Sequence, residues 1–223
     1  MSTDALINVN GESVQTLEIL FLTTVLMLLP AVVIMMTSFT RYVIVFSFLR
    51  TAMGTQQNPP NMVLVGMALI LTLFTMSPTL AEINEEAFAP YQADEITQEE
   101  FINRAQVPLK RFMGNWVELQ SMEMYCNISG VDAPANEEEV VNLPLMVIVP
   151  AFVTSELKRA FITGFLLYIP FLLVDMLVAS TLMSMGMVML PPAMISTPFK
   201  LLLFIMLDGW QLLFSTLVAS YSG

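Results

Sequence analysis

The sequence predicts an all-α, membrane-associated protein built from helical hairpins with kinked or broken helices. Of its 223 residues, 56% are hydrophobic and only 12% are charged, whereas about 25% of the residues of a typical soluble domain are charged. Runs of about 20 apolar residues are long enough to cross a bilayer. Four stretches come close to this length, at residues 17–36, 62–81, 161–183 and 199–220.

Charge and hydropathy divide the chain into three regions. Residues 1–81 hold an N-terminal tail and a first helical hairpin, residues 82–142 form an acidic segment, and residues 143–223 form further hairpins. The net charge is −11, and about −10 of it lies between Glu82 and Glu139, where there are 13 acidic and 3 basic residues. No basic surface is present, so the sequence excludes a nucleic-acid-binding protein.

The first hairpin follows a polar tail, residues 1–16, that contains no Lys or Arg. The tail therefore lacks the cationic start of a signal peptide. Either a leader has been removed before Met1, or the first helix inserts with its N-terminus outside. Arg41 and Arg50 are the only basic residues near the first two long apolar runs. Cytoplasmic connections carry an excess of such cations, so we expect this connection in the cytoplasm and the acidic segment outside.

The acidic segment is predicted to form a small extracytoplasmic insert of one or two amphipathic helices. Thr97 followed three residues later by Glu100 matches a capping box, a pattern that begins many helices. Residues 127–142 are rich in turn formers and predict a loop. Behind the capping box, apolar residues recur at helical spacing and are interrupted by Pro108: Phe101, Ala105, Phe112, Trp116 and Leu119.

Residues 143–155 are apolar, but the run is too short to span a bilayer and contains Pro144 and Pro150. A run of this length predicts a segment that is buried in protein or re-entrant. Charged and aromatic residues beside or inside apolar runs are expected to serve helix or subunit packing. These residues are Arg41, Arg50, Glu156, Lys158, Asp208 and Trp210.

Asp175 and Lys200 lie inside two successive apolar runs. If these runs form an antiparallel hairpin whose tip is midway between Met187 and Val188, each charge lies 12.5 positions from the tip. They would then sit at the same height and could form an ion pair. An unpaired charge in hydrocarbon costs about 2.5 to 3.5 kcal/mol, which favours pairing. The alternative is that each charge meets another subunit or a water-filled space.

The segment between these two runs is crowded with methionine. Met183, Met185, Met187 and Met189 alternate around Gly186 and lead into Pro191 and Pro192. Alternation excludes a single helical stripe, and paired prolines exclude an uninterrupted helix. We therefore predict a loop or hairpin tip. Methionine adapts to irregular partners, so the tip could seal a hole that must open, or the methionines could simply fill a buried turn.

Residues that carry catalysis are scarce in this sequence. It contains no histidine, a single cysteine and no phosphate-binding glycine loop, so neither a serine–histidine system nor a nucleotide site is present. We expect no enzyme activity, no cofactor and no metal site. Any energy source must be external.

Several long motifs resemble those of the flagellar biosynthetic protein FliP family. They are TSFTRYVIVFSFLRTAMGTQQNPPN at residues 37–61, PAFVTSELK at 150–158, FLLYIPFLLVD at 165–175, the methionine segment, and PFKLLLFIMLDGW at 198–210. The similarity extends from about residue 17 to residue 220. The GTQQ sequence that begins at Gly54 resembles flagellar members more than the related virulence-type proteins.

The resemblance implies a core subunit of the flagellar type III protein-export gate in the bacterial inner membrane, at the flagellar basal body. Members of the family form a homo-oligomer that joins FliQ and FliR in a helical cone, associated with FlhB and FlhA. The resemblance also implies a methionine gasket, here Met183, Met185, Met187 and Met189, that closes the pore and deforms around unfolded export substrates. A ring of such side chains would exclude ions by dewetting.

Three other functions remain open. A virulence-type export-gate homologue would have the same architecture. A small-solute or ion transporter would explain acidic residues in apolar helices, although no inverted repeat is evident. A scaffold that nucleates the secretion apparatus without lining its channel would need no seal.

Overall fold

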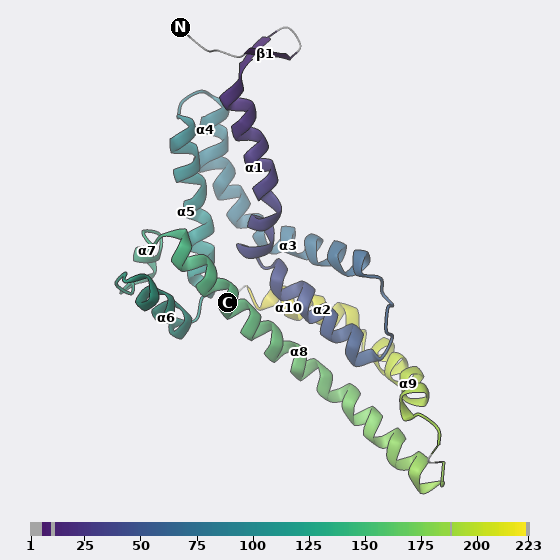
Figure 1. Cartoon of the computed structure of the whole chain (residues 1–223). Helices are drawn as coiled ribbons and strands as arrows, with labels where there is room; N and C mark the ends of the chain where they lie inside the picture. Colours follow the sequence, from purple (N-terminus) through teal and green to yellow (C-terminus); the bar gives the residue numbers. More distant parts are fainter. Residues whose placement is uncertain (1–5, 10–11, 188, 222–223) are drawn as a thin grey trace.

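The computed structural model describes residues 6–9, 12–187 and 189–221. Helices make up most of the described chain, as the sequence predicts. Figure 1 shows two arms that meet at a central crossing. The upper arm holds the N-terminal helix and the acidic segment, and the lower arm is a long hairpin that ends in the methionine segment.

Two short strands precede the helices and were not predicted. β1 (Leu6–Val9) pairs antiparallel with β2 (Glu12–Gln15), so that Leu6 lies opposite Gln15. The polar tail therefore contains a small β-hairpin. It leads directly into α1 (Thr16–Met35), which closely matches the first predicted apolar helix.

The first hairpin consists of α2 (Phe39–Met53) and α3 (Asn61–Ile83). α2 ends at Gly54, whose φ of 73° is left-handed, the conformation for which glycine is preferred at helix C-termini. α3 passes through Pro78 and continues through a π-helical turn, η1 (Asn84–Phe88), into α4 (Ala89–Gln92). The helix therefore extends beyond residue 82, where the acidic segment begins.

The acidic segment contains two longer helices. α5 (Gln98–Trp116) begins with the predicted capping box, in which the Glu100 amide donates to Thr97 Oγ1 at 3.3 Å and the Thr97 amide donates to the Glu100 carboxylate at 3.0 Å. α5 continues through Pro108. Leu119 was expected on the same apolar face, but it begins α6 (Leu119–Ser129) and is 81% exposed. The predicted loop contains one helical turn, α7 (Glu137–Val140).

The largest difference from prediction is α8 (Leu145–Ser184), a single helix of 40 residues that joins two segments expected to be separate. At 1.5 Å per residue it is about 60 Å long. The prediction failed because Glu156, Lys158 and Arg159 were taken as a break, whereas the helix carries them without interruption. The first part of α8 is nevertheless buried in protein, as predicted for residues 143–155.

The last apolar run is divided instead of continuous. α9 (Pro192–Met206) and α10 (Gly209–Ala219) meet at a 62° bend. Asp208 adopts a left-handed conformation at this bend, with φ of 47°. A Cβ atom on Gly209 would come within 2.2 Å of the Phe204 ring, so the tight bend requires glycine there. This break bears out the expectation of broken helices.

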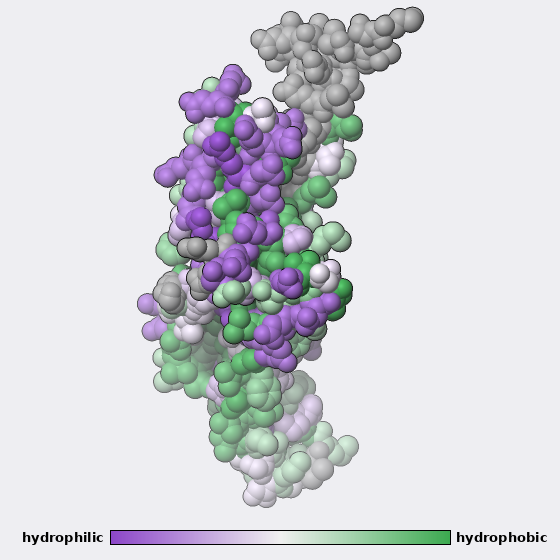
Figure 2. All heavy atoms as spheres, turned by 90° about the vertical axis from the view of Figure 1, so that its left-hand side faces the viewer, coloured by the Kyte–Doolittle hydropathy of each residue, from purple (hydrophilic) through white to green (hydrophobic). Residues whose placement is uncertain are grey.

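Two hydrophobic clusters hold the arms together. One lies where α2 packs against α8, α9 and α10, and includes Tyr42, Phe46 and Leu49. The other lies where α8 meets α5 and α6, and includes Met113 and Phe152. Tyr221 packs against both clusters. On the face drawn in Figure 2, hydrophilic residues gather over the upper part and hydrophobic residues over the lower part.

Among the described residues, two helices are long and apolar enough to cross a membrane. They are the continuous helix Asn61–Gln92 and α8, and the bent pair α9–α10 would make a third. The sequence predicted four such stretches, and three of them fall in these helices.

Candidate functional site

The methionine segment forms the tip of the α8–α9 hairpin, at the end of the lower arm (Figure 1). Met183 is in the last turn of α8, and Met185, Met187 and Met189 lie in the connection that follows. Gly186 has a left-handed φ of 74°, which lets the chain leave the helix. The predicted loop is therefore present. Val188, which flanks the predicted midpoint of the tip, lies outside the described residues.

The four methionine side chains are open to the surroundings. Their exposed fractions are 66% for Met183, 67% for Met185, 42% for Met187 and 99% for Met189. Such exposure argues against methionine as filler of a buried turn in the single chain. Flexible apolar side chains at the end of a long arm form a surface that can adapt to a partner.

Asp175 and Lys200 form the ion pair that the hairpin geometry predicts. Lys200 Nζ lies 2.6 Å from Asp175 Oδ2 and also donates to the Ala52 carbonyl at 3.0 Å. Ser196 Oγ donates to the other Asp175 oxygen at 2.6 Å. The Lys200 side chain is 6% exposed and that of Asp175 is 32% exposed. The pair therefore connects α8 to α9, and Lys200 also ties α9 to α2.

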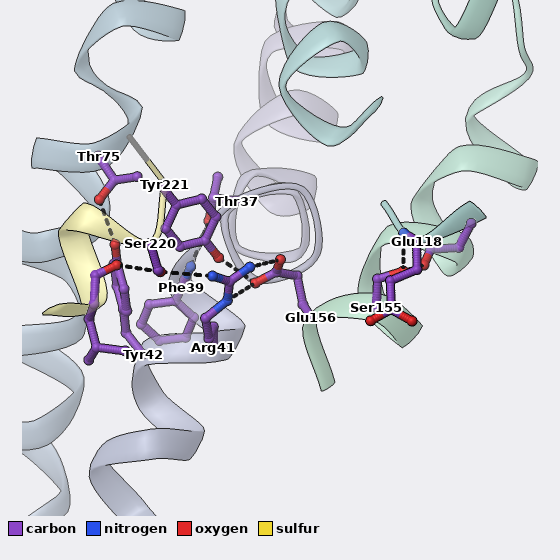
Figure 3. A network of polar contacts seen from close by, with 12 residues as sticks. Thr37, Phe39, Arg41, Tyr42, Thr75, Glu118, Ser155, Glu156, Ser220 and Tyr221 are labelled. Carbon is purple, nitrogen blue, oxygen red and sulfur yellow. Dashed lines mark hydrogen bonds and ion pairs between the residues drawn. The ribbon is translucent and has the colours of Figure 1, made fainter. Parts of the chain in front are cut away.

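A second ion pair lies at the central crossing, where α2 meets α8 (Figure 3). The Arg41 guanidinium contacts both Glu156 carboxylate oxygens, with Nε donating to Oε2 at 2.8 Å. The side chains are 4% and 0% exposed. Arg41 Nη1 also donates to Ser220 Oγ at 2.9 Å. A bidentate arrangement of this kind satisfies both charges away from water.

Tyr221 completes this network from the C-terminal end of the chain. Its hydroxyl donates to Glu156, and Arg41 lies over its ring at 3.9 Å from the centroid. The ring also contacts Trp116, with centroids 5.1 Å apart. Burial and the Glu156 carboxylate raise the pKa of Tyr221, so its hydroxyl stays protonated and acts as a donor.

The other residues predicted for packing occupy different environments. Arg50 donates to Asn61 Oδ1 at 2.6 Å. Lys158 pairs with Glu118 at 2.6 Å on an exposed face, where such a pair contributes little to stability. Trp210 packs edge-on against Phe204, with centroids 5.2 Å apart. Asp208 is exposed, and its side chain does not cap α10.

The sequence indicated Arg41 and Glu156 separately but not as partners, because 115 positions separate them. Ser220 and Tyr221 were not predicted at all. The available signal was chemical: each charge lies in apolar surroundings and needs an opposite charge. No spacing rule identifies that partner.

Two buried groups outside the apolar spans have shifted pKa values. Burial lowers the pKa of Lys110, which donates to the Val141 carbonyl at 3.0 Å. Burial raises the pKa of the Cys126 thiol, so less of the reactive thiolate is present at neutral pH. Among the residues that the structure describes, no group of three His, Cys, Asp or Glu side chains could hold a metal ion.

Long apolar helices, together with charges neutralised inside the protein, define a membrane-associated helical protein. Comparison with known sequences gives the family. The FliP family profile matches residues 22–217, and the chain belongs to the FliP family.

The curated relatives extend this similarity over most of both chains. The flagellar biosynthetic protein FliP of Bacillus subtilis is 48% identical over 206 residues, which cover 92% of each chain. The protein of the same name from Aquifex aeolicus is 46% identical over 95% of this chain and 88% of its own length. The flagellar biosynthetic protein FliP of Pectobacterium carotovorum is 48% identical over 94% of this chain and 79% of its own length.

Proposed function

We propose that this chain is a channel subunit of the flagellar protein-export gate. Several copies surround a path for unfolded flagellar substrates, and the methionine tips of neighbouring copies meet and close it. The observation that carries this proposal is the exposure of Met183, Met185, Met187 and Met189 at the end of the α8–α9 hairpin. Family membership supports a role in flagellar protein export.

The chemistry of the tip suits a seal that must open for polypeptides. Apolar side chains that line a narrow constriction exclude water and ions by dewetting. A thioether offers only weak hydrogen bonding, so it does not hold a passing peptide backbone. Because methionine is unbranched, the tip can rearrange around side chains of different size.

The proposal places the chain in the bacterial inner membrane, at the flagellar basal body. In this arrangement FliQ and FliR complete a helical cone with the copies of this chain, and FlhB and FlhA lie beside it. The acidic segment, residues 82–142, forms an extracytoplasmic insert. On the face drawn in Figure 2, the upper part is hydrophilic, which is consistent with an acidic insert that lies in water. α1, also in the upper arm, exposes apolar side chains, among them Leu20, Met27 and Leu28.

The internal ion pairs favour a protein channel over an ion transporter. Acidic residues in apolar helices often mark a transport path. Here Glu156 and Asp175 are each bound to a cation of the same chain, and Glu156 is fully buried. Charges held in this way serve the fold and are poorly placed to relay ions. We propose no catalytic activity and no cofactor.

Site-specific photo-crosslinking tests whether the tip contacts cargo. A photoreactive amino acid replaces Met189, and cells export a substrate fused to a folded domain that stalls in the gate. We expect a covalent adduct between this chain and the stalled substrate. Met146, which is 87% exposed at the other end of α8, is the matched control position and should give none. Adducts of equal yield at both positions, or at neither, would contradict a cargo path at the tip.

A further inference from the structure

A groove, the α8–α10 groove, runs along the surface between α8 and α10, beside the bend at Asp208, and the end of α9 forms part of its wall. It consists of an apolar hollow of about 440 Å³ and a smaller hollow of about 280 Å³, and both are lined by Thr163 and Thr216. The larger hollow is lined mainly by aliphatic and aromatic side chains, among them Leu166 and Leu212. The smaller one is lined by Arg159 and Trp116. The groove is therefore apolar along most of its length and basic at one end.

The charges of the C-terminal region leave two residues without an ionic partner. From residue 143 onward the sequence contains three acidic and three basic side chains. Glu156 pairs with Arg41, Lys158 with Glu118, and Asp175 with Lys200. Within the described part of the chain, Arg159 and Asp208 have no oppositely charged side chain at ion-pair distance. They are opposite in sign, and each lies beside the groove.

Asp208 projects from an exposed apolar surface. Ile205, Met206 and Leu207 before it are 70%, 74% and 59% exposed. When another molecule covers this surface, the Asp208 carboxylate loses its contact with water. This loss is unfavourable unless a cation pairs with the carboxylate. This surface has the features that complement the groove, namely apolar side chains together with one negative charge.

We propose that the α8–α10 groove binds a second copy of this chain. Ile205, Met206 and Asp208 of one copy lie in the groove of its neighbour, while Leu207 lines the groove of its own chain. Asp208 of one copy pairs with Arg159 of the other. This inference rests on the proposed function, because the export gate contains several copies. It adds the surface through which they associate.

Arg50 is the other cation of the apolar regions that lacks an acidic partner among the described residues, and it is a poorer candidate for Asp208. Its guanidinium already donates to Asn61 Oδ1 at 2.6 Å within its own chain. Arg159 has only a distant contact with the Trp116 ring, whose centroid lies 5.8 Å from its guanidinium carbon. It therefore keeps its hydrogen-bond donors available for a carboxylate.

Asp208 also has a local role that the test must separate from pairing. Its left-handed backbone is tolerated by Asp and Asn better than by most residues. Asp208→Asn therefore keeps the bend and removes only the charge. If the residue serves the bend alone, this variant will behave like the wild type.

The test measures the mass of the complex extracted in mild detergent. We expect Asp208→Asn and Arg159→Gln each to reduce the fraction of the chain in multi-copy complexes by about tenfold. This size corresponds to the coupling energy that is common for close ion pairs at interfaces. Arg159→Lys keeps the charge and should stay close to the wild type. The exchange of charges, Arg159→Asp with Asp208→Lys, should restore association relative to either single variant.

Cross-linking locates the contact directly. In a Cys126→Ser background, Arg159→Cys and Asp208→Cys are placed in separate chains with different tags and treated with a short bismaleimide. We expect mixed dimers, whereas Arg159→Cys paired with Ile128→Cys, an exposed position that does not line the groove, should give none.

The outcomes distinguish this inference from the proposed function. Multi-copy complexes that form without mixed dimers, and that are unaffected by Asp208→Asn, would overturn only the groove contact. A wild-type chain that stays monomeric, alone and with its partners, would overturn both.

Discussion

Arg41 and Glu156 place opposite charges in the centre of the molecule, where both side chains are almost completely buried. Desolvation of two charges is costly, and their mutual attraction offsets it only when the geometry is good. The bidentate contact, Ser220 and Tyr221 supply that geometry. Removal of one partner would leave the other buried without compensation.

We therefore expect Arg41→Met to destabilise the folded protein by about 3 to 5 kcal/mol, and the double variant Arg41→Met with Glu156→Leu to cost far less. Thermal unfolding in detergent measures both effects. Lys158→Met is the matched control, because the Lys158–Glu118 pair is exposed and contributes about 1 kcal/mol or less. Equal shifts in unfolding temperature for Arg41→Met and Lys158→Met would contradict a special contribution of the buried Arg41–Glu156 pair to stability.

At the scale of single residues, the sequence predicts local contacts better than distant ones. The Thr97–Glu100 capping box follows from four adjacent residues, and the predicted box is present. The Asp175–Lys200 pair was also predicted, because a hairpin relates two positions by simple counting. The Arg41–Glu156 pair depends on how two separate hairpins pack, which no local pattern contains.

The α8–α9 hairpin carries the methionine tip, and we propose that the Asp175–Lys200 pair fixes its register. Asp175→Ala would leave the Lys200 ammonium largely buried with the Ala52 carbonyl as its remaining partner. We expect the free energy of unfolding to fall by about 2 kcal/mol, less than for a fully buried pair because Asp175 is partly exposed. We also expect poorer assembly and export.

Asp175→Ala combined with Lys200→Met should recover part of this stability, since no unpaired charge remains. Ser180→Ala, elsewhere on α8, serves as the control. The role of a clamp would be contradicted if Asp175→Ala and Lys200→Ala each left assembly and export unchanged.

Close packing of α8 on α2 depends on a small residue. A Cβ atom at Gly164 would come within 2.6 Å of the Phe48 ring, whereas a Cβ atom at Gly66 would meet nothing within 4 Å. Gly164→Ala should destabilise the protein by about 1 to 3 kcal/mol through overpacking. Gly66→Ala, also inside a helix, should be neutral or stabilise by up to about 1 kcal/mol. Thermal unfolding measures both, and shifts of the same sign and size would contradict this packing.

At the scale of elements, apolar content was predicted well and helix boundaries poorly. Charges at residues 156–159 looked like the end of a segment, yet α8 runs through them, because Glu, Lys and Arg are good helix formers. The break at Asp208 lies inside an apolar run and depends on a tight approach of Gly209 to Phe204. The β-hairpin could have been found, since Asn10-Gly11 between short runs is a common turn signal.

For the molecule as a whole, we expect the acidic segment and the α2–α3 connection on opposite sides of the membrane. Ile128→Cys, in the acidic segment, should react with a membrane-impermeant maleimide added to spheroplasts. Gln57→Cys should react only after the membrane is opened. Cys126 is buried and its raised pKa suppresses the thiolate, so it should not contribute to the labelling. Equal labelling of both cysteines in intact spheroplasts would contradict this orientation.

Ionic conductance of the purified, reconstituted export-gate complex tests the central claim most directly. We predict that the wild-type complex is closed to ions and that replacement of Met183, Met185, Met187 and Met189 by alanine makes it leak without loss of assembly. Alanine at three exposed methionines away from the tip, Met62, Met124 and Met146, should leave it closed. A tip variant that assembles, remains closed to ions and exports normally would contradict the account.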